Sequence, residues 1–260
     1  MTTTIIKLIA LLTMVFDHIG EFIPGTSIYL RYIGRLSFPL FMFCFVWGLH
    51  YTHDRKRYFL RLYIAGVIMA VMNFVLSNIV TTPSHGIPNN IFVTFLLMGL
   101  LIDLIEKILS GHKNARKYVL AFVGLQIVSS IIIFVFESHS VDVLDVFYGS
   151  RFIGALLPNL LQNEGGLFFI IFGIVIYFTK ERKWLMSLCY CLFSLSFLAE
   201  CAPTFTYENV WIYHYQWLMV FSLPIMLLYN HKKGIGMKYF FYIFYPVHIA
   251  LLFLIGSRLM

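Results

Sequence analysis

Residues 5–23 read IIKLIALLTMVFDHIGEFI, and this stretch decides the fold class. It is apolar for most of its length and about as long as the roughly 20 residues that a helix needs to cross a bilayer. Three ionisable residues, Asp17, His18 and Glu21, nevertheless lie in its last third. Because a charged group inside a membrane helix costs at least about 2.5 kcal/mol, such residues usually face a partner or a wet cavity. The stretch therefore predicts a membrane span whose polar end has either a structural or a catalytic role.

The composition of the whole chain also predicts a membrane protein. Of the residues, 60% are hydrophobic and only 12% are charged, whereas about 25% of a soluble domain is charged. Apolar runs of about 18 residues or more recur along the chain, and they lack the alternation of membrane strands. We therefore expect an all-α, polytopic transmembrane helical bundle. The net charge of +7 is explained by cytoplasmic loops rich in Lys and Arg, so no nucleic-acid partner is expected.

We expect a single integral membrane domain over residues 1–260, with about nine spans and a range of about eight to ten. Residues 151–163 are too short for a clear span and contain Pro158, so a half-helix or re-entrant piece is expected there. The expected spans are residues 5–23, 37–51, 58–76, 91–108, 118–136, 166–179, 184–199, 210–229 and 239–256.

The connections between these spans differ in character. Residues 27–36 are expected to form an amphipathic piece, and residues 77–90 a polar loop with Pro83 and Pro88. The acidic stretch at residues 137–150, which includes Asp142 and Asp145, is expected to be a loop on the outer side.

The distribution of basic residues predicts the topology. With the N-terminus in the cytoplasm and residues 151–163 not crossing, most of the 19 basic residues face the cytoplasm, as the positive-inside rule requires. The exceptions next to the outer third of the membrane are Arg31, Arg35 and Arg151. The same orientation places Asp17 and His18 at that outer level.

Asp17 and His18 are the first candidates for chemistry. An imidazole needs only a small shift in its pKa to act as an acid or base near neutral pH, and a nearby carboxylate can orient it or balance its charge. The alternative is a structural knot in which Asp17 pairs with Arg31 or Arg35 and holds the spans together.

Three further candidates lie close to expected spans. Arg35 precedes the second span and is placed to bind a carboxylate or phosphate, although an interfacial arginine also fits. His248 lies in the middle of the last span, where it and Tyr245 are expected to line a polar channel; an interhelical hydrogen bond is the alternative. Glu164, at the end of the re-entrant piece, is expected to line the same channel.

A cluster of basic residues after the second span is the candidate cofactor site. Such a cluster could hold the phosphates of coenzyme A, although topology and lipid headgroups explain it more simply. No HxxxH or paired Cys/His spacing is present, so no metal site is expected. The residues of this basic group are His53, Arg55, Lys56, Arg57 and Arg61.

Three motifs together resemble the TraX family of bacterial membrane proteins. They are DH at residues 17–18, GRLSFPLF at residues 34–41 and FYIFYPVH at residues 241–248, and the resemblance covers essentially the whole chain. The family is named for a conjugation protein that N-acetylates pilin, and it is distantly similar to membrane acyltransferases in which a first-helix His acts. Its Tyr-Asn-Gly is Tyr229-Asn230-His231 here, which weighs against a tight turn at that point.

The resemblance implies that Asp17, His18, Arg35 and His248 lie near a reacting centre. We therefore expect a multi-pass acyltransferase of the bacterial cytoplasmic membrane that uses acetyl-CoA as co-substrate and no metal. Its acceptor would be a pilin-like protein N-terminus or an envelope component such as a glycan, on the outer side, with membrane lipid as a further partner. A proton-coupled transporter and a non-catalytic envelope assembly factor are the alternatives.

Overall fold

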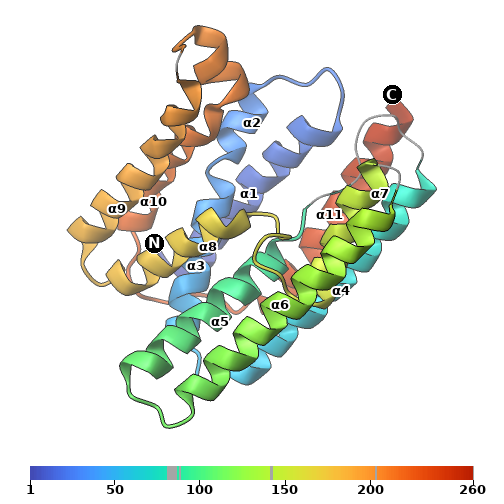
Figure 1. Ribbon diagram of the computed structural model, residues 1–260. Helices are drawn as coiled ribbons and strands as arrows, with labels where there is room; N and C mark the ends of the chain where they lie inside the picture. The colour runs from blue at the N-terminus through green and yellow to red at the C-terminus, as the bar shows by residue number, and fades with distance from the viewer. Residues whose placement is uncertain (81–86, 88, 141–142, 203, 260) are drawn as a thin grey trace. The chain divides into compact units, whose positions relative to one another are not determined.

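The computed structural model describes residues 1–80, 87, 89–140, 143–202 and 204–259 (Figure 1). All regular secondary structure in these residues is helical, which confirms the predicted all-α class. Three residues of the expected loops, Pro83, Pro88 and Asp142, lie outside the described residues, and so does the side chain of Asp145.

The chain folds into two compact units, which are described separately here. The first unit comprises Met1–His50 and Val175–Met260, and the second comprises Tyr51–Ile174. The single integral membrane domain expected from the sequence stays a prediction.

The first unit is organised around α1, Thr3–Phe22 (Figure 1). Its bounds are close to those of the first expected span, but its crossing of the membrane stays a prediction. The Thr2 hydroxyl caps its start by accepting the Ile5 N–H, as a helix N-terminus requires. Three helices pack against α1: α2 (Tyr29–Gly34), α3 (Ser37–His50) and α11 (Lys238–Leu259). Of the motifs that resemble TraX, one therefore lies on α1 itself and the other two lie on helices that pack against α1.

The other helices of this unit correct one prediction. The expected continuous span at residues 210–229 is instead broken into three short pieces. The backbone leaves helical geometry at His214, with φ −118° and ψ 49°. Pro224 follows in the first turn of the last piece, where its missing N–H is tolerated. The elements are α9 (Lys183–Ser196), η1 (Phe197–Cys201), η2 (Asn209–Tyr213), η3 (Tyr215–Ser222) and α10 (Leu223–Leu227).

The second unit packs α4 against α5 and α7, and α6 against α5 and α7. The Asp54 carboxylate accepts the Arg57 N–H and caps α4. These helices are α4 (Arg55–Ile79), α5 (Ile91–Leu109), α6 (Ala115–His139) and α7 (Val143–Leu156). The helix α8 (Gly166–Thr179) begins in the second unit and ends in the first.

The expected acidic loop also needs correction. The helix α7 begins at Val143, so the second half of the expected loop at residues 137–150 is helical. The chain is then irregular around Pro158, which cannot donate a backbone hydrogen bond. Polar side chains satisfy this segment instead: Gln126 donates to the Pro158 carbonyl and accepts from the Leu160 N–H, each at 2.9 Å.

Helix length and composition identify a membrane protein. Within the described residues, five helices are long and apolar enough to cross a bilayer. Two shorter apolar helices, Gly166–Thr179 and Tyr215–Leu227, accompany them. The helical membrane bundle is therefore confirmed, while the nine crossings and the cytoplasmic N-terminus stay predictions. The five helices are Tyr29–His50, Arg55–Ile79, Ala115–His139, Lys183–Cys201 and Tyr239–Leu259.

Candidate functional site

Neighbouring residues on α1 face different helices. Successive residues of an α-helix point about 100° apart, so Asp17 and His18 cannot share one set of partners. Asp17 pairs with Arg31 and Arg35, which lie on α2 and at its end, whereas His18 contacts His248 on α11. The two residues therefore belong to two different arrangements, a charged cluster and a histidine pair.

The charged cluster comprises Asp17, Glu21, Arg31 and Arg35. Nη2 of Arg35 donates to both carboxylate oxygens of Asp17, at 2.5 and 2.7 Å. Nη1 of Arg31 lies 3.1 Å from Oδ1 of Asp17 and donates to Glu21 at 2.9 Å. Two carboxylates thus balance two guanidinium groups, so the cluster carries no net charge.

Side chains of η3 complete the charged cluster. Gln216 accepts from Nη1 of Arg35 at 2.9 Å, and the Tyr215 hydroxyl accepts from Nε of Arg31 at 3.4 Å. Nε of Arg35 donates to the Arg31 carbonyl at 3.3 Å. Arg35 therefore donates hydrogen bonds from all three of its nitrogens to other groups of the protein. Asp17 pairs with Arg31 and Arg35, as the structural alternative in the sequence analysis proposed.

Gly34 allows this close approach of α1 and α2. A Cβ atom added at Gly34 would overlap the Asp17 carboxylate. Any larger side chain at this position must therefore displace the ion pair between Asp17 and Arg35.

The histidine pair lies beside the charged cluster and is more deeply buried. Nδ1 of His18 lies 2.7 Å from Nε2 of His248, and the two side chains expose only 4% and 7% of their surface. The rings are stacked, with centroids 5.0 Å apart and planes at 26°. Rings of Phe22 and Tyr245 lie about His18, with centroids 6.0 and 6.4 Å away.

The backbone determines where the protons of the pair lie. Nδ1 of His248 is 2.8 Å from the Phe244 carbonyl oxygen, and a carbonyl oxygen can only accept. Nδ1 of His248 therefore carries a proton, which leaves its Nε2 as an acceptor in the neutral ring. Nδ1 of His18 must then donate to it, and the lone pair of neutral His18 falls on Nε2.

This arrangement can move a proton. A neutral imidazole with its lone pair on Nε2 is a base, and the hydrogen bond at Nδ1 fixes its tautomer and orientation. His248 thus takes the orienting position that the sequence analysis gave to Asp17.

The predicted channel residues do not all lie in one unit. His248 and the buried Tyr245 belong to the first unit. Glu164 belongs to the second unit, where its carboxylate is close enough to stabilise the Arg151 cation. The common channel stays a prediction.

Carboxylates partly neutralise the basic group. Arg55 pairs with Asp103 at 3.0 Å and also with Glu106. Arg57 pairs with Asp54 at 3.0 Å, and the Arg61 guanidinium lies over the Tyr58 ring. His53 and Lys56 are exposed. The whole group lies in the second unit.

Asp17, His18 and Glu21 place possible metal-ligating atoms within 4.8 Å of one another. Arg31 and Arg35 already bind both of these carboxylates. A divalent cation would have to compete with two guanidinium groups, so the geometry offers little support for a metal here.

Sequence reasoning did not assign a role to Tyr215. Its hydroxyl accepts from Arg31, and its ring lies under the Arg35 guanidinium at 5.4 Å. The residues around Tyr215 carry no signal for this role, because their apolar composition predicts a continuous helix and not the break at His214.

The comparisons with known proteins bear on the whole chain. Residues 2–256 match the family model described as TraX protein. The chain belongs to the TraX family. It is also 27% identical over 258 residues to a probable fimbrial assembly protein FimC, serogroup H1, of Dichelobacter nodosus, covering 95% of this chain and 92% of that protein. No solved structure matches the chain.

His231 is the departure from the TraX pattern found in the sequence. It adopts φ 60°, a left-handed conformation that glycine adopts most easily. The backbone therefore bends at this position without a glycine. The His231 ring packs against those of Trp47 and Tyr229, with centroids 4.7 and 5.0 Å away.

Proposed function

We propose that this TraX chain is a membrane-embedded acyltransferase that moves an acetyl group from acetyl-CoA to an amine or hydroxyl acceptor. The observation that carries the proposal is the hydrogen bond between His18 and His248, which leaves the His18 lone pair on Nε2. A buried, oriented base is what activation of an amine or hydroxyl requires.

The proposed reaction begins with proton removal from the acceptor. Nε2 of His18 takes the proton as the acceptor nitrogen or oxygen forms a bond to the thioester carbonyl carbon. The carbon–sulfur bond then breaks, and the proton passes from His18 to the departing thiolate of coenzyme A. In an alternative route, Nε2 attacks the thioester carbonyl carbon, the carbon–sulfur bond breaks and the thiolate of coenzyme A leaves. The acceptor then attacks the acetyl carbon of acetyl-His18, the bond to Nε2 breaks, and the acceptor proton passes to the thiolate.

The structure changes the roles proposed for the charged residues. Asp17 and Arg35 bind each other rather than His18. We propose that they hold α2 and η3 against α1 and so fix the part of the helix that carries His18. They are positioning residues in this account, and the carboxylate that Arg35 binds is that of Asp17.

The positive charge of the basic group supports acetyl-CoA as the donor, and the relative supports the choice of acceptor. The basic group offers cations for the coenzyme A phosphates, and Arg61 retains a buried Nε atom without a hydrogen-bond partner in the described residues. The relative named as a probable fimbrial assembly protein favours a pilin-like protein or another envelope component as acceptor. We place the N-terminus in the cytoplasm and acetyl delivery on the outer side of the bacterial cytoplasmic membrane.

Mass spectrometry of cell-surface proteins and glycans tests this function. Cells with the wild-type chain should carry an acetyl-sized mass addition that is absent from cells lacking the chain. His18→Ala at equal membrane abundance should remove it, while His139→Ala, on an exposed face of α6, should retain it. An unchanged acetyl pattern in His18→Ala cells would refute the proposal.

The second candidate is a non-catalytic assembly factor. The name of the relative, a probable fimbrial assembly protein, and the interlocked charged cluster favour it. In that case the double variant Asp17→Asn, His18→Gln should assemble surface fibres as well as the wild type, provided that it folds. A proton-coupled transporter is the third candidate. Loss of the acetyl-sized mass addition in His18→Ala cells would give it no support.

A further inference from the structure

Phe244 meets His248 with both its ring and its backbone. The two rings are stacked, with centroids 4.9 Å apart and planes at 16°. The Phe244 carbonyl oxygen also lies 2.8 Å from Nδ1 of His248. Residues four positions apart lie on one face of a helix, so the spacing of the two residues on α11 itself brings the rings together.

The face of an aromatic ring attracts positive charge. A cation within about 6 Å of the ring centroid is stabilised, and more strongly where water is excluded. His248 exposes only 7% of its surface, and Phe244 is half-buried. The Phe244 carbonyl adds to this effect, because a hydrogen bond from a charged donor is stronger than one from a neutral donor. Phe244 would therefore stabilise a positive charge on His248 in two ways.

The surroundings of His18 offer less to a positive charge. The rings of Phe22 and Tyr245 lie 6.0 and 6.4 Å from it and are tilted by 45° and 57°. The charged cluster acts on His18 with both signs, since Asp17 attracts a positive charge while two arginines repel it. These contacts favour His248 over His18 as the place for the charge of a protonated pair.

The hydrogen bond within the pair gives the charge a path. When Nε2 of His18 accepts a proton, the proton on its Nδ1 can cross the 2.7 Å to Nε2 of His248. His18 is then neutral again, with its proton on Nε2 instead of Nδ1. His248 becomes the cation, with protons on both nitrogens and Nδ1 still donating to the Phe244 carbonyl.

We propose that Phe244 is a positioning residue of this site, which stabilises the His248 imidazolium formed when His18 takes a proton from the acceptor. The protons move back when coenzyme A leaves: Nε2 of His18 gives its proton to the thiolate, and Nε2 of His248 returns a proton to Nδ1 of His18. The pair thus ends each cycle with the protons it began with. This inference rests on the proposed acyl transfer.

Fluorinated phenylalanines at position 244 test the proposal. Ring fluorines withdraw electrons from the face but change the size of the ring little. Each added fluorine should therefore slow acetyl transfer further, by about tenfold with three. A rate that does not depend on fluorination at this position would overturn the proposal and leave acyl transfer itself standing.

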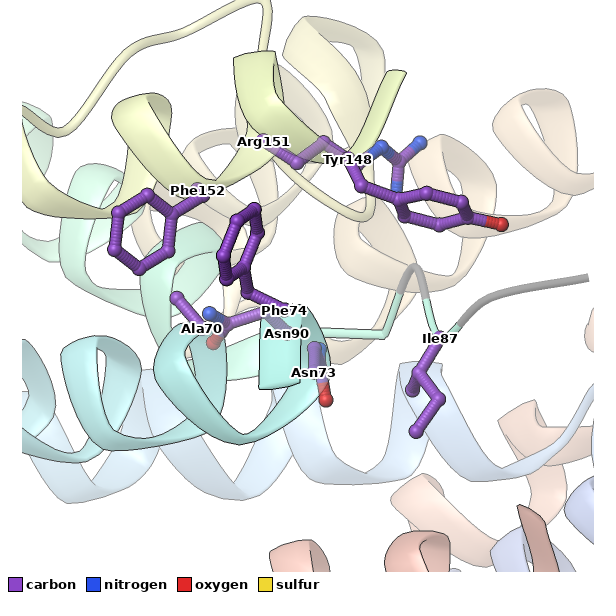
Figure 2. Close-up of a pocket in the computed structure, with 8 residues that line it drawn as sticks. All are labelled: Ala70, Asn73, Phe74, Ile87, Asn90, Tyr148, Arg151 and Phe152. Atoms are coloured by element: carbon purple, nitrogen blue, oxygen red, sulfur yellow. The ribbon is translucent and has the colours of Figure 1, made fainter. Parts of the chain in front are cut away.

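Phe152 in the second unit is the matched control. Figure 2 shows its ring beside that of Phe74 in the wall of a small pocket. The two centroids are 5.1 Å apart, with planes at 34°, and Phe152 is half-buried like Phe244. No histidine is among the described residues that line this pocket. The same fluorinated series at position 152 should therefore leave the rate unchanged, and an equal loss there would contradict a specific role for Phe244.

Nitrogen NMR of the wild-type chain tests the proposal without acyl transfer. As the pH is lowered, the first proton taken up by the pair should leave His248 protonated on both nitrogens and His18 on Nε2 alone. A charged His18 beside a neutral His248 would overturn the proposal, and so would a pair that stays neutral until the chain unfolds. If wild-type cells show no acetyl addition, the proposed function fails, and this measurement still decides which histidine carries the charge.

Discussion

The charged cluster and the histidine pair begin at consecutive residues of α1 but satisfy their polar atoms differently. In the cluster, each charged group meets an opposite charge, and Arg35 donates from all three nitrogens within the protein. In the pair, the imidazole of His248 orients that of His18, and the lone pair of neutral His18 lies on Nε2. The difference separates residues that hold α1 in place from residues able to accept a proton.

Activity should separate the two arrangements most strongly. We expect His18→Ala to slow acetyl transfer by about 10²–10⁴-fold, the usual contribution of a general base. Asp17→Asn should stay within about tenfold of the wild type per folded molecule, because the Asp17 carboxylate is bound by Arg31 and Arg35. Transfer of labelled acetyl groups to the cell envelope, normalised to folded protein, measures both. Equal losses in the two variants would erase the distinction.

His248 should affect activity less than His18 does. We expect His248→Ala to slow transfer by about 10–100-fold, because His18 loses the acceptor that fixes its tautomer. His248→Gln should recover part of the rate, since its amide oxygen can accept the same proton. A purely structural role predicts no such recovery when Ala and Gln variants are equally stable. The pH dependence of transfer, measured for both variants, is the second readout.

The cluster should matter chiefly for stability. Asp17→Asn leaves two guanidinium groups short of one carboxylate, and we expect it to lower the unfolding free energy by about 2 kcal/mol. That is below the full cost of breaking a buried pair, about 3–5 kcal/mol, since these side chains retain 16–19% of their exposure. Thermal unfolding in detergent measures the change. An unaltered melting temperature would show that the cluster does not hold the helices together.

Gly34 offers a milder way to disturb the cluster alone. Gly34→Ala drives a methyl group into the Asp17 carboxylate, and we expect a loss of about 1–2 kcal/mol. Gly124→Ala is the matched control, because open space surrounds that helical position and alanine there should stabilise by about 0.5–1 kcal/mol. Unfolding curves of the two variants should shift in opposite directions. A shift in the same direction would contradict the close approach of α1 and α2.

The helices were largely predictable because apolar runs have a simple length rule. The runs at residues 5–23 and 91–108 became α1 and α5 with ends within a few residues. The broken segment after Glu208 was not predictable, because its composition is as apolar as that of a span. Its break depends on tertiary bonds that Tyr215 and Gln216 make to arginines distant in sequence.

The site was predictable in its members but not in its pairing. The sequence identified Asp17, His18, Arg35 and His248, and it left Asp17 with two possible partners, the arginines Arg31 or Arg35 and its neighbour His18. The 100° rotation between successive helical residues argues against the pair with His18, but which neighbour each residue meets depends on how α2 and α11 pack on α1. A long-range contact across 230 positions leaves no local signature.

Nitrogen NMR of the full chain, selectively labelled at its nine histidines, tests the central claim most directly. The resonances of the pair would be assigned by their loss in His18→Gln and His248→Gln. The account predicts a proton on Nδ1 of His18, a coupling from it to Nε2 of His248, and no proton on Nε2 of His18. A proton on Nε2 of His18, with Nδ1 bare, would contradict the assignment of His18 as the base.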